Sequence, residues 1–579
     1  MKLIKGTNFT IQEIGKKKLI LQGAINHNYI LLPVEDSSEI SKLTVIVDNQ
    51  NVKQLNIRLA TKKTEYYVPL DLREFKGQNV ALILENACIS AKAWEDLKVS
   101  DTFDRKNTEH FRPIFHFSPD YGWMNDPNGM VYHNGTYHLC FQYNPYGSTW
   151  ENMSWGHATT KDLITWTHQP DALHKDGLGD MFSGGAVVDK DNVSGLGKDA
   201  IIAFYTNAGI GQTQCIAYSL DNGKTFTKYK NNPILTSSEP DFRDPKVFWH
   251  EATAKWIMIL AVGQHMEIYN SDNLLDWTYK SSFGEGQGGH GGVWECPDLV
   301  ELPIEDRQKH KWLLICNINP GGPFGGSAAQ YFVGSFDGEK FTNEAPLQTK
   351  WMDFGKDYYA TVTWSNAPNK RVIALGWMSN WQYGNQLPTK QYRSANAIPR
   401  DLKLFEHEGQ TYLKSEVSKE LTPFLHNISR LQALSIDKEE TLENITKGAK
   451  AYQIDMELKN NNADKLGFKL FNDKGDEVSF YIDVHEKTLK MDRTKSGLTD
   501  FDPTQAFKVK TTAPLFLKED LIKLTLLVDA CSIEVFGDGG RFTMTNLVFP
   551  QEQYNNIHFF SYGGCFKVNS VSVQEIKTK

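Results

Sequence analysis

The segment TTKDLITWTHQP at residues 159–170 contains a pattern that returns three times: an acidic turn followed by an aromatic residue and a threonine. The later copies are YSLDNGKTFTKY at 218–229, YNSDNLLDWTYK at 269–280 and GSFDGEKFTNE at 334–344. Their aromatic residues lie 60, 51 and 64 positions apart. Repeats of roughly this length, each supplying a few antiparallel strands, are typical of propeller blades. Together with a strand set around RVIALGWMSNWQY (371–383), they predict five blades.

The segments on either side of the repeats are also rich in strand patterns. Residues 1–105 alternate apolar and polar positions, as in KLTVIVDNQ (42–50), and predict a small sandwich-like β-domain. Residues 112–410 form the predicted propeller, and residues 420–579 return to strand patterns such as KLTLLVD (523–529). The predicted fold is therefore all-β: a five-bladed β-propeller followed by a C-terminal β-sandwich, with an extra N-terminal β-domain.

The charge and the aromatic content of the chain indicate which classes of binding partner it suits. The net charge of -8 argues against nucleic acid and against an anionic membrane surface, both of which favour basic proteins. The sequence contains no run of about 18 apolar residues, so no membrane span is predicted. The 14 Trp, 23 Tyr and 32 Phe residues suit sheet packing and also supply flat surfaces for sugar rings.

The seven cysteines are widely spaced and never form a Cys-x-x-Cys pair, so neither a disulfide framework nor a zinc site is predicted. The N-terminus lacks the continuous apolar core of a signal peptide. Localisation stays open: a secreted, periplasmic or cell-surface protein is expected if a signal has been removed, and a cytoplasmic one otherwise.

Three carboxylates stand in apolar strand patterns: Asp126 in WMNDPNG, Asp244 in FRDPKVFW and Glu295 in WECPD. Each also has a plain structural interpretation. Asp126 could belong to an Asp-Pro-Asn-Gly turn, Asp244 could be a turn residue paired with Arg243, and Glu295 could lie at a sheet edge. A carboxylate in an apolar strand is costly unless it is paired or functional, and three such sites in different blades favour function. Paired carboxylates with aromatic neighbours are what glycoside hydrolysis requires.

Five ordered blocks, WMNDPNG, FQYNP, FSGGAV, FRDPKVFW and WECPD, resemble the signature of glycoside hydrolase family 32, which comprises invertases, inulinases, levanases and other β-fructosidases. The late segment SIEVFGDGGRFTMTNLVFP (532–550) resembles the block of that family's C-terminal sandwich. The first hundred residues are similar to an accessory domain of some bacterial members.

This resemblance implies a role for each carboxylate: Asp126 as nucleophile, Glu295 as general acid/base and Asp244 as stabiliser of the transition state. The resemblance also implies retention of configuration, with neither a metal nor an organic cofactor. The residues that would line the pocket for a terminal fructose are Asn125, Gln142, Trp150, Phe182, Ser183, Arg243 and Trp381.

We therefore predict a retaining hydrolase that releases fructose from levan, inulin or sucrose-like substrates. Its partner would be a fructan or fructo-oligosaccharide, and a homodimer is an open option. Three alternatives stay open. They are an endo-acting fructanase, an inverting hydrolase directed at arabinan or xylan, and a catalytically silent sugar-binding protein on the same scaffold.

Overall fold

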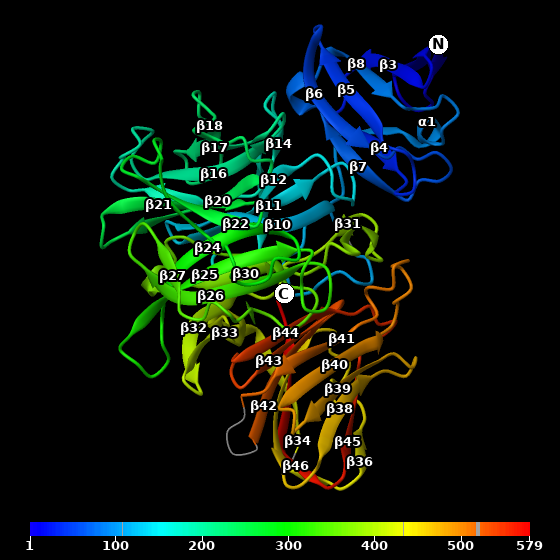
Figure 1. Cartoon of the computed structure of the whole chain (residues 1–579). Coiled ribbons are helices and arrows are strands. Elements are labelled where there is room, and N and C mark those ends of the chain that lie inside the picture. The colour runs from blue at the N-terminus through cyan, green and yellow to red at the C-terminus, as the bar shows by residue number, and fades with distance from the viewer. Residues whose placement is uncertain (107, 432, 517–520, 579) are drawn as a thin grey trace.

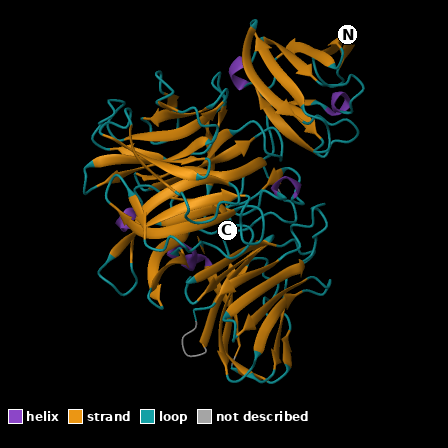
Figure 2. Ribbon diagram, viewed as in Figure 1, coloured by secondary structure: helices purple, strands orange, loops and turns teal. Residues whose placement is uncertain are grey.

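The computed structural model describes residues 1–106, 108–431, 433–516 and 521–578. Strands dominate this part of the chain (Figure 2), and three β-rich bodies follow one another from the N-terminus to the C-terminus (Figure 1). The helical segments in the described ranges are short: α1 (Ala93–Asp96), η1 (Arg73–Phe75), η2 (Pro368–Lys370), η3 (Gly384–Gln386) and η4 (Lys419–Phe424). No helix among the described residues is long and apolar enough to cross a membrane.

The N-terminal domain packs a six-stranded sheet against a three-stranded one. Alternation along Ser41–Val47 sends Leu43, Val45 and Val47 into the shared core, as the period of two predicts. The larger sheet contains β1 (Lys2–Leu3), β2 (Thr10–Gly15), β3 (Lys18–Ala24), β8 (Asn79–Glu85), β5 (Ser41–Val47) and β6 (Gln50–Ile57). The smaller sheet contains β7 (Tyr66–Asp71), β4 (Tyr29–Val34) and β9 (Lys98–Ser100).

Five sheets form the propeller, which confirms the predicted number of blades. Blades 1 and 2 contain β10 (Gly122–His133), β11 (Thr136–Asn144), β12 (Ser154–Thr160) and β13 (Thr167–Leu173), then β14 (Asp180–Met181), β15 (Ala186–Asp189), β16 (Ala200–Ala208), β17 (Gln212–Ser219), β18 (Thr227–Lys228) and β19 (Leu235–Thr236). Blade 3 contains β20 (Phe242–His250), β21 (Lys255–Val262), β22 (His265–Ser271) and β23 (Thr278–Phe283). Blade 4 contains β24 (Val293–Pro303), β25 (His310–Asn319), β26 (Ala328–Phe336), β27 (Phe341–Asn343) and β28 (Lys350–Trp351). Blade 5 contains β29 (Tyr359–Thr363), β30 (Ile373–Trp377), β32 (Arg400–His407) and β33 (Gln410–Val417), while β31 (Tyr392–Arg393) joins blade 1 beside β10.

The repeated acidic motif is the turn that leads into β13, β18, β23 and β27 in blades 1 to 4. In blade 1 the Asp162 carboxylate accepts hydrogen bonds from the backbone N–H groups of Ile164 and Thr165. In blade 3 the residue that caps the turn is Asn273, one position after the aspartate of the sequence motif. A short side chain that satisfies turn amides is what the motif encodes, and Asp or Asn serves equally.

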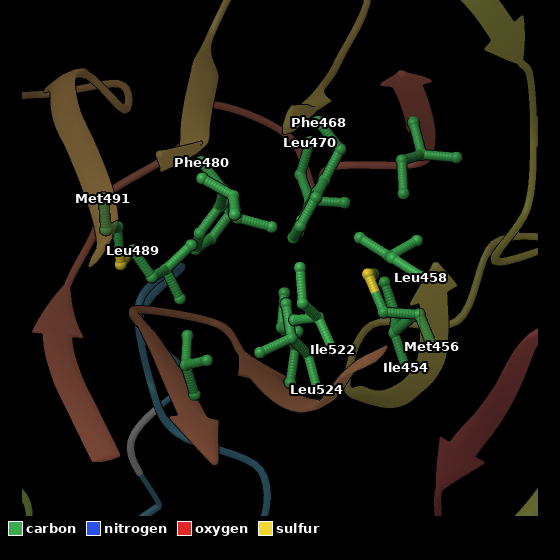
Figure 3. Packing of buried hydrophobic residues seen from close by; sticks show 14 of the residues in the cluster. Ile454, Met456, Leu458, Phe468, Leu470, Phe480, Leu489, Met491, Ile522 and Leu524 are labelled. Carbon is green, nitrogen blue, oxygen red and sulfur yellow. The ribbon is translucent and has the colours of Figure 1, made fainter. Parts of the chain in front are cut away.

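The C-terminal sandwich packs two sheets over one apolar core (Figure 3). Ile454, Met456 and Leu458 alternate with outward residues on one strand, and Phe468 and Phe480 stack at 4.6 Å on the facing sheet. The first sheet contains β34 (Leu425–Leu431), β35 (Leu434–Ile436), β37 (Tyr452–Asn460), β42 (Leu521–Asp529), β43 (Ser532–Gly537), β44 (Phe542–Leu547) and β46 (Phe566–Ile576). The second contains β36 (Glu439–Leu442), β38 (Lys465–Phe471), β39 (Glu477–Asp483), β40 (Thr488–Lys495), β41 (Lys510–Pro514) and β45 (Asn556–Tyr562).

The propeller and the sandwich meet through buried charges. His116, which precedes blade 1, bonds to Asp529 and Glu534 of the sandwich, each at 2.9 Å. Burial disfavours a protonated His116, but the two carboxylates outweigh it and raise the pKa of His116 to about 9. Arg400 of blade 5 binds Glu534 at 2.7 Å and Asp353 at 2.9 Å. The two bodies are therefore joined by ion pairs that water does not reach.

Candidate active site

One strand from each blade contacts its neighbours in a closed ring: β10, β15, β20, β24 and β29. Four of these five strands lose register with their neighbours at a similar place. The irregularities fall between Met124 and Pro127, Arg243 and Lys246, Glu295 and Asp298, and Tyr359 and Val362. A β-bulge re-aims a side chain out of the regular alternation. The bulges therefore turn polar side chains from several blades toward one region.

Three bulge residues have backbone conformations that side chains with a Cβ rarely adopt. The φ angles of Asp244, Cys296 and Ala360 are 65°, 42° and 53°. Such residues cost about 1–3 kcal/mol each and persist where the surrounding structure holds them. Their gathering in one ring marks this end of the propeller as a functional site.

Asp126 lies within β10 and not in a connecting turn, so the Asp-Pro-Asn-Gly turn interpretation is wrong. Ser183 donates to its Oδ2 at 2.7 Å, and Asn125 donates to its Oδ1 at 3.0 Å. The Cys296 thiol approaches Oδ2 at 3.5 Å. Removal from water and repulsion by Glu295 raise the pKa of Asp126, and these three donors oppose that rise.

Asp244 lies on β20, two blades further along in sequence, and also contacts Cys296. The Cys296 backbone N–H donates to Asp244 Oδ2 at 2.8 Å, and its sulfur lies 3.6 Å from the same oxygen. Burial is the largest influence on this carboxyl. Arg243 opposes it, Glu295 and Asp126 add to it, and the pKa of Asp244 rises to about 7. Burial also raises the pKa of Cys296 well above its usual value, so the thiol stays protonated and donates.

Glu295 projects from β24 and is held by two donors. Arg243 Nη2 lies 3.0 Å from its Oε1, and the Tyr359 hydroxyl donates to its Oε2. The Arg243 guanidinium also contacts Asp241 at 2.6 Å but Asp244 only at 3.9 Å. Pairing of Arg243 with Asp244 is thus the weaker of its contacts. Burial and Glu295 raise the pKa of Tyr359 well above its usual value, which keeps its hydroxyl a donor.

Aromatic side chains surround these carboxylates. Trp123 and Trp381 stack at 5.8 Å, and Trp381 and Phe182 pack against the apolar cluster that contains Cys296 and Tyr359. Trp150 meets Phe182 edge to face at 6.2 Å and is 40% exposed. The structure therefore joins the predicted aromatic residues into one wall beside the three carboxylates.

Gln142 lies on β11 of blade 1. Its side chain is 2% exposed, and its Nε2 donates to the Met181 carbonyl at 3.0 Å. Met181 directly precedes Phe182 and Ser183, so this hydrogen bond ties Gln142 to the segment that carries both residues. Asn125 is buried as well: its Oδ1 accepts from the Trp123 indole at 2.8 Å while its Nδ2 holds Asp126.

Two residues of the site were not identified from sequence. Tyr359 comes from blade 5, and its stretch YYATVTW carries no signal beyond an ordinary apolar strand. Cys296 stood in WECPD, but nothing in that block showed that its N–H and thiol would serve two carboxylates from other blades. The described residues contain no group of three or more His, Cys, Asp or Glu side chains that could hold a metal ion.

Comparison with known proteins places this architecture in a family. Residues 116–415 match the glycosyl hydrolases family 32 N-terminal domain, and residues 421–576 match the glycosyl hydrolases family 32 C terminal domain. The chain belongs to glycosyl hydrolases family 32. Family 32 membership agrees with the resemblance seen in the sequence blocks, whereas residues 15–115 match only a domain of unknown function.

Several relatives of this family 32 chain are named for fructan hydrolysis. A levanase of Bacillus subtilis is 44% identical over 482 residues, which cover 81% of this chain and 71% of that protein. An extracellular exo-inulinase of Aspergillus niger is 38% identical over 510 residues, covering 80% and 94%. The crystal structure of exo-inulinase from Aspergillus awamori superposes with a TM-score of 0.76 at 36% identity, covering 82% of this chain and 99% of that one. A β-fructofuranosidase of Schwanniomyces occidentalis gives 0.74 at 34% identity, covering 81% and 98%.

Proposed function

We propose that this family 32 hydrolase releases fructose from the ends of β-fructans and from sucrose-like oligosaccharides by double displacement. The observation that carries the proposal is the meeting of Asp126, Asp244 and Glu295 around the Cys296 backbone and thiol. Glycoside hydrolysis with retention needs one carboxylate that attacks and one carboxyl that donates a proton. The names of the levanase and exo-inulinase relatives support fructans as the substrate class.

Asp126 is assigned as the nucleophile. The Asp126 carboxylate is the acceptor in its hydrogen bonds with Ser183, Asn125 and Cys296. Such bonds stabilise the ionised form of the carboxylate. In the first step Asp126 bonds to the anomeric carbon while the glycosidic bond breaks, and the leaving oxygen takes a proton from Glu295. In the second step Glu295 removes a proton from water, which attacks the anomeric carbon and frees Asp126.

The remaining polar groups set the ionisation and the orientation of the three carboxyl groups. Burial, together with repulsion among the three carboxylates, raises the pKa of Asp126 and raises that of Asp244 to about 7. Arg243 and Tyr359 orient the Glu295 carboxyl group by donating one hydrogen bond to each of its two oxygens. Asp244 is assigned to the sugar hydroxyls, where a contact that strengthens as positive charge develops on the ring lowers the barrier.

The aromatic wall of Trp381, Phe182 and Trp150 would hold the terminal fructose beside the carboxylates, and this favours removal of single units from chain ends. An endo-acting enzyme on the same residues is the second candidate, and product size distinguishes the two. A homodimer stays a prediction, which sedimentation of the full chain would test.

Product analysis of wild type and Asp126→Ala on inulin, levan and sucrose tests the proposal. The matched control is Asp272→Ala, an aspartate of blade 3 whose side chain is 78% exposed. We expect fructose alone from wild type and control, and none from Asp126→Ala, with unchanged thermal unfolding of all three. Oligosaccharide ladders would indicate endo action, and wild type that forms no product from any fructan would contradict the hydrolase assignment.

A further inference from the structure

The N-terminal domain touches the propeller beside the substrate wall. Trp150 lies in the connection between β11 and β12 of blade 1, and the N-terminal domain packs next to this blade (Figure 1). The side chains two residues before and two residues after Trp150 are bound by that domain. Trp150 itself stays 40% exposed.

The first anchor is Asp36, which follows β4 of the N-terminal domain. Its Oδ1 accepts from the Tyr66 hydroxyl at 2.5 Å, and its Oδ2 lies 3.3 Å from Ser148 Oγ. The Ser148 backbone N–H donates to the Tyr66 oxygen at 3.0 Å. Both the backbone and the side chain of Ser148 are therefore fixed by Asp36 and Tyr66.

Arg393 extends this anchor to Trp150. Its Nη2 lies 3.2 Å from Asp36 Oδ2, and its Nη1 donates to the carbonyls of Ser148 at 2.8 Å and Asn385 at 2.6 Å. The Asn385 side chain then accepts from the Trp150 backbone N–H at 2.9 Å. The Arg393 side chain is 4% exposed, so its ion pair with Asp36 is shielded from solvent.

The second anchor holds the other side of Trp150. The Asn56 N–H donates to Asn152 Oδ1 at 2.8 Å, and Asn152 Nδ2 donates back to the Asn56 carbonyl at 2.9 Å. Asn152 has a φ of 50°, a conformation that Asn tolerates better than most residues. Arg58 adds an ion pair to Glu151 at 3.5 Å.

We propose that the N-terminal domain is a positioning element of the substrate site, which fixes the Trp150 segment so that its ring is presented to the terminal fructose of the fructan. A loop that is ordered before binding does not lose that freedom when substrate arrives, so affinity rises without any new contact. The proposal rests on the proposed function, since it takes the sugar chain as the ligand of Trp150. It assigns Asp36, Tyr66, Asn56 and Asn152 as positioning residues.

The test is a double variant, Tyr66→Phe with Asn152→Asp, in the full chain. The first change removes the hydroxyl that Ser148 binds. The second keeps the side-chain size and the acceptor for Asn56 but places an oxygen against the Asn56 carbonyl. The matched control is Tyr67→Phe with Asn222→Asp: Tyr67 is next on the same strand and bonds within its own domain, and Asn222 has a φ of 63° in a blade 2 turn.

Two measurements decide the proposal. Hydrogen exchange of the amides at 148–152 should quicken at least about tenfold in the double variant and stay unchanged in the control, because two to three hydrogen bonds are lost. KM for inulin or levan should rise about fivefold with kcat nearly unchanged. In a Trp150→Ala background the same double variant should raise KM no further, since coupled residues are not additive.

Unchanged exchange at 148–152 would overturn the proposal whatever the activity. Equal rises in KM with and without Trp150 would also overturn it, because the N-terminal domain would then act elsewhere. Failure of the proposed function is distinct from both results: wild type would give no fructose from any fructan, while exchange would still report whether the segment is held.

Discussion

Replacement of Arg400 by methionine should destabilise the protein by about 3–5 kcal/mol, the range found when one partner of a buried ion network is removed. Arg400 is fully buried, and its guanidinium meets Asp353, Glu534, Thr543 and Thr545 at 2.6–3.1 Å. Methionine fills much of the space but leaves the Asp353 carboxylate without its cation and the Glu534 carboxylate with His116 alone, although their side chains are only 2% and 0% exposed.

The pKa of Glu534 shows what Arg400 contributes. Burial alone would raise the pKa of this carboxyl, but Arg400 and His116 lower it below its ordinary value. Loss of the guanidinium removes the largest of the opposing influences. The remaining partner, His116, already shares its charge with Asp529 at 2.9 Å.

Arg371→Met is the matched control. Arg371 also binds two carboxylates, Asp401 at 2.6 Å and Glu420 at 2.5 Å, but its side chain is 15% exposed and theirs are 17% and 18% exposed. Pairs nearer the surface contribute about 0.2–1 kcal/mol each, so this variant should lose about 1 kcal/mol. Urea unfolding followed by near-ultraviolet circular dichroism would compare the two variants. Equal losses, or a loss below about 1 kcal/mol for Arg400→Met, would refute the claim that solvent exclusion at this interface sets the cost.

Three further predictions concern the site. Tyr359→Phe should lower kcat about 10- to 100-fold on sucrose with little change in thermal unfolding, because Glu295 loses a charge-assisted hydrogen bond; unaltered kcat would contradict its aiming role. For Asp244, the folded pKa of about 7 lies above the unfolded value near 3.9, so the folded state holds an extra proton between these values and stability falls as pH rises through that window. The free energy of unfolding of wild type should therefore fall between pH 5 and pH 8 by about 3 kcal/mol more than that of Asp244→Asn. Urea unfolding at each pH measures this difference. Alkylation by iodoacetamide should modify exposed Cys88, whose pKa is lowered by hydrogen bonds from Ser90, and should spare buried Cys296 and the activity; loss of activity with label on Cys296 would be the contrary result.

Much of the fold could be predicted because its signals are local. The turn motif around Asp162 and its three later copies reflect amides that a nearby Asp or Asn must satisfy, so four of the five blades can be recognised from a local pattern. Alternation along strands such as Ser41–Val47 reports which face is buried. Asp126, Asp244 and Glu295 could be singled out because a carboxylate in an apolar strand is costly to bury unless it is paired or functional.

The residues that were missed depend on contacts between distant parts of the chain. Tyr359 meets Glu295 only because blade 5 closes the ring beside blade 4. Glu534 looks like the outward residue of an alternating strand, yet the propeller covers it completely. The hydrogen bond from Asn152 to Asn56 of the N-terminal domain likewise joins residues 96 positions apart. No pattern within one strand contains such information.

Azide rescue of Asp126→Ala tests the central claim most directly, because the configuration of the product reports which carboxylate attacks. With Asp126 as nucleophile, azide enters the vacated space and yields the α-fructosyl azide from a β-fructoside, whereas Glu295→Ala with an activated leaving group yields the β-fructosyl azide. That pair of products is the predicted result. A β-fructosyl azide from Asp126→Ala, or rescue of neither variant, would contradict Asp126 as the nucleophile of a retaining fructosidase.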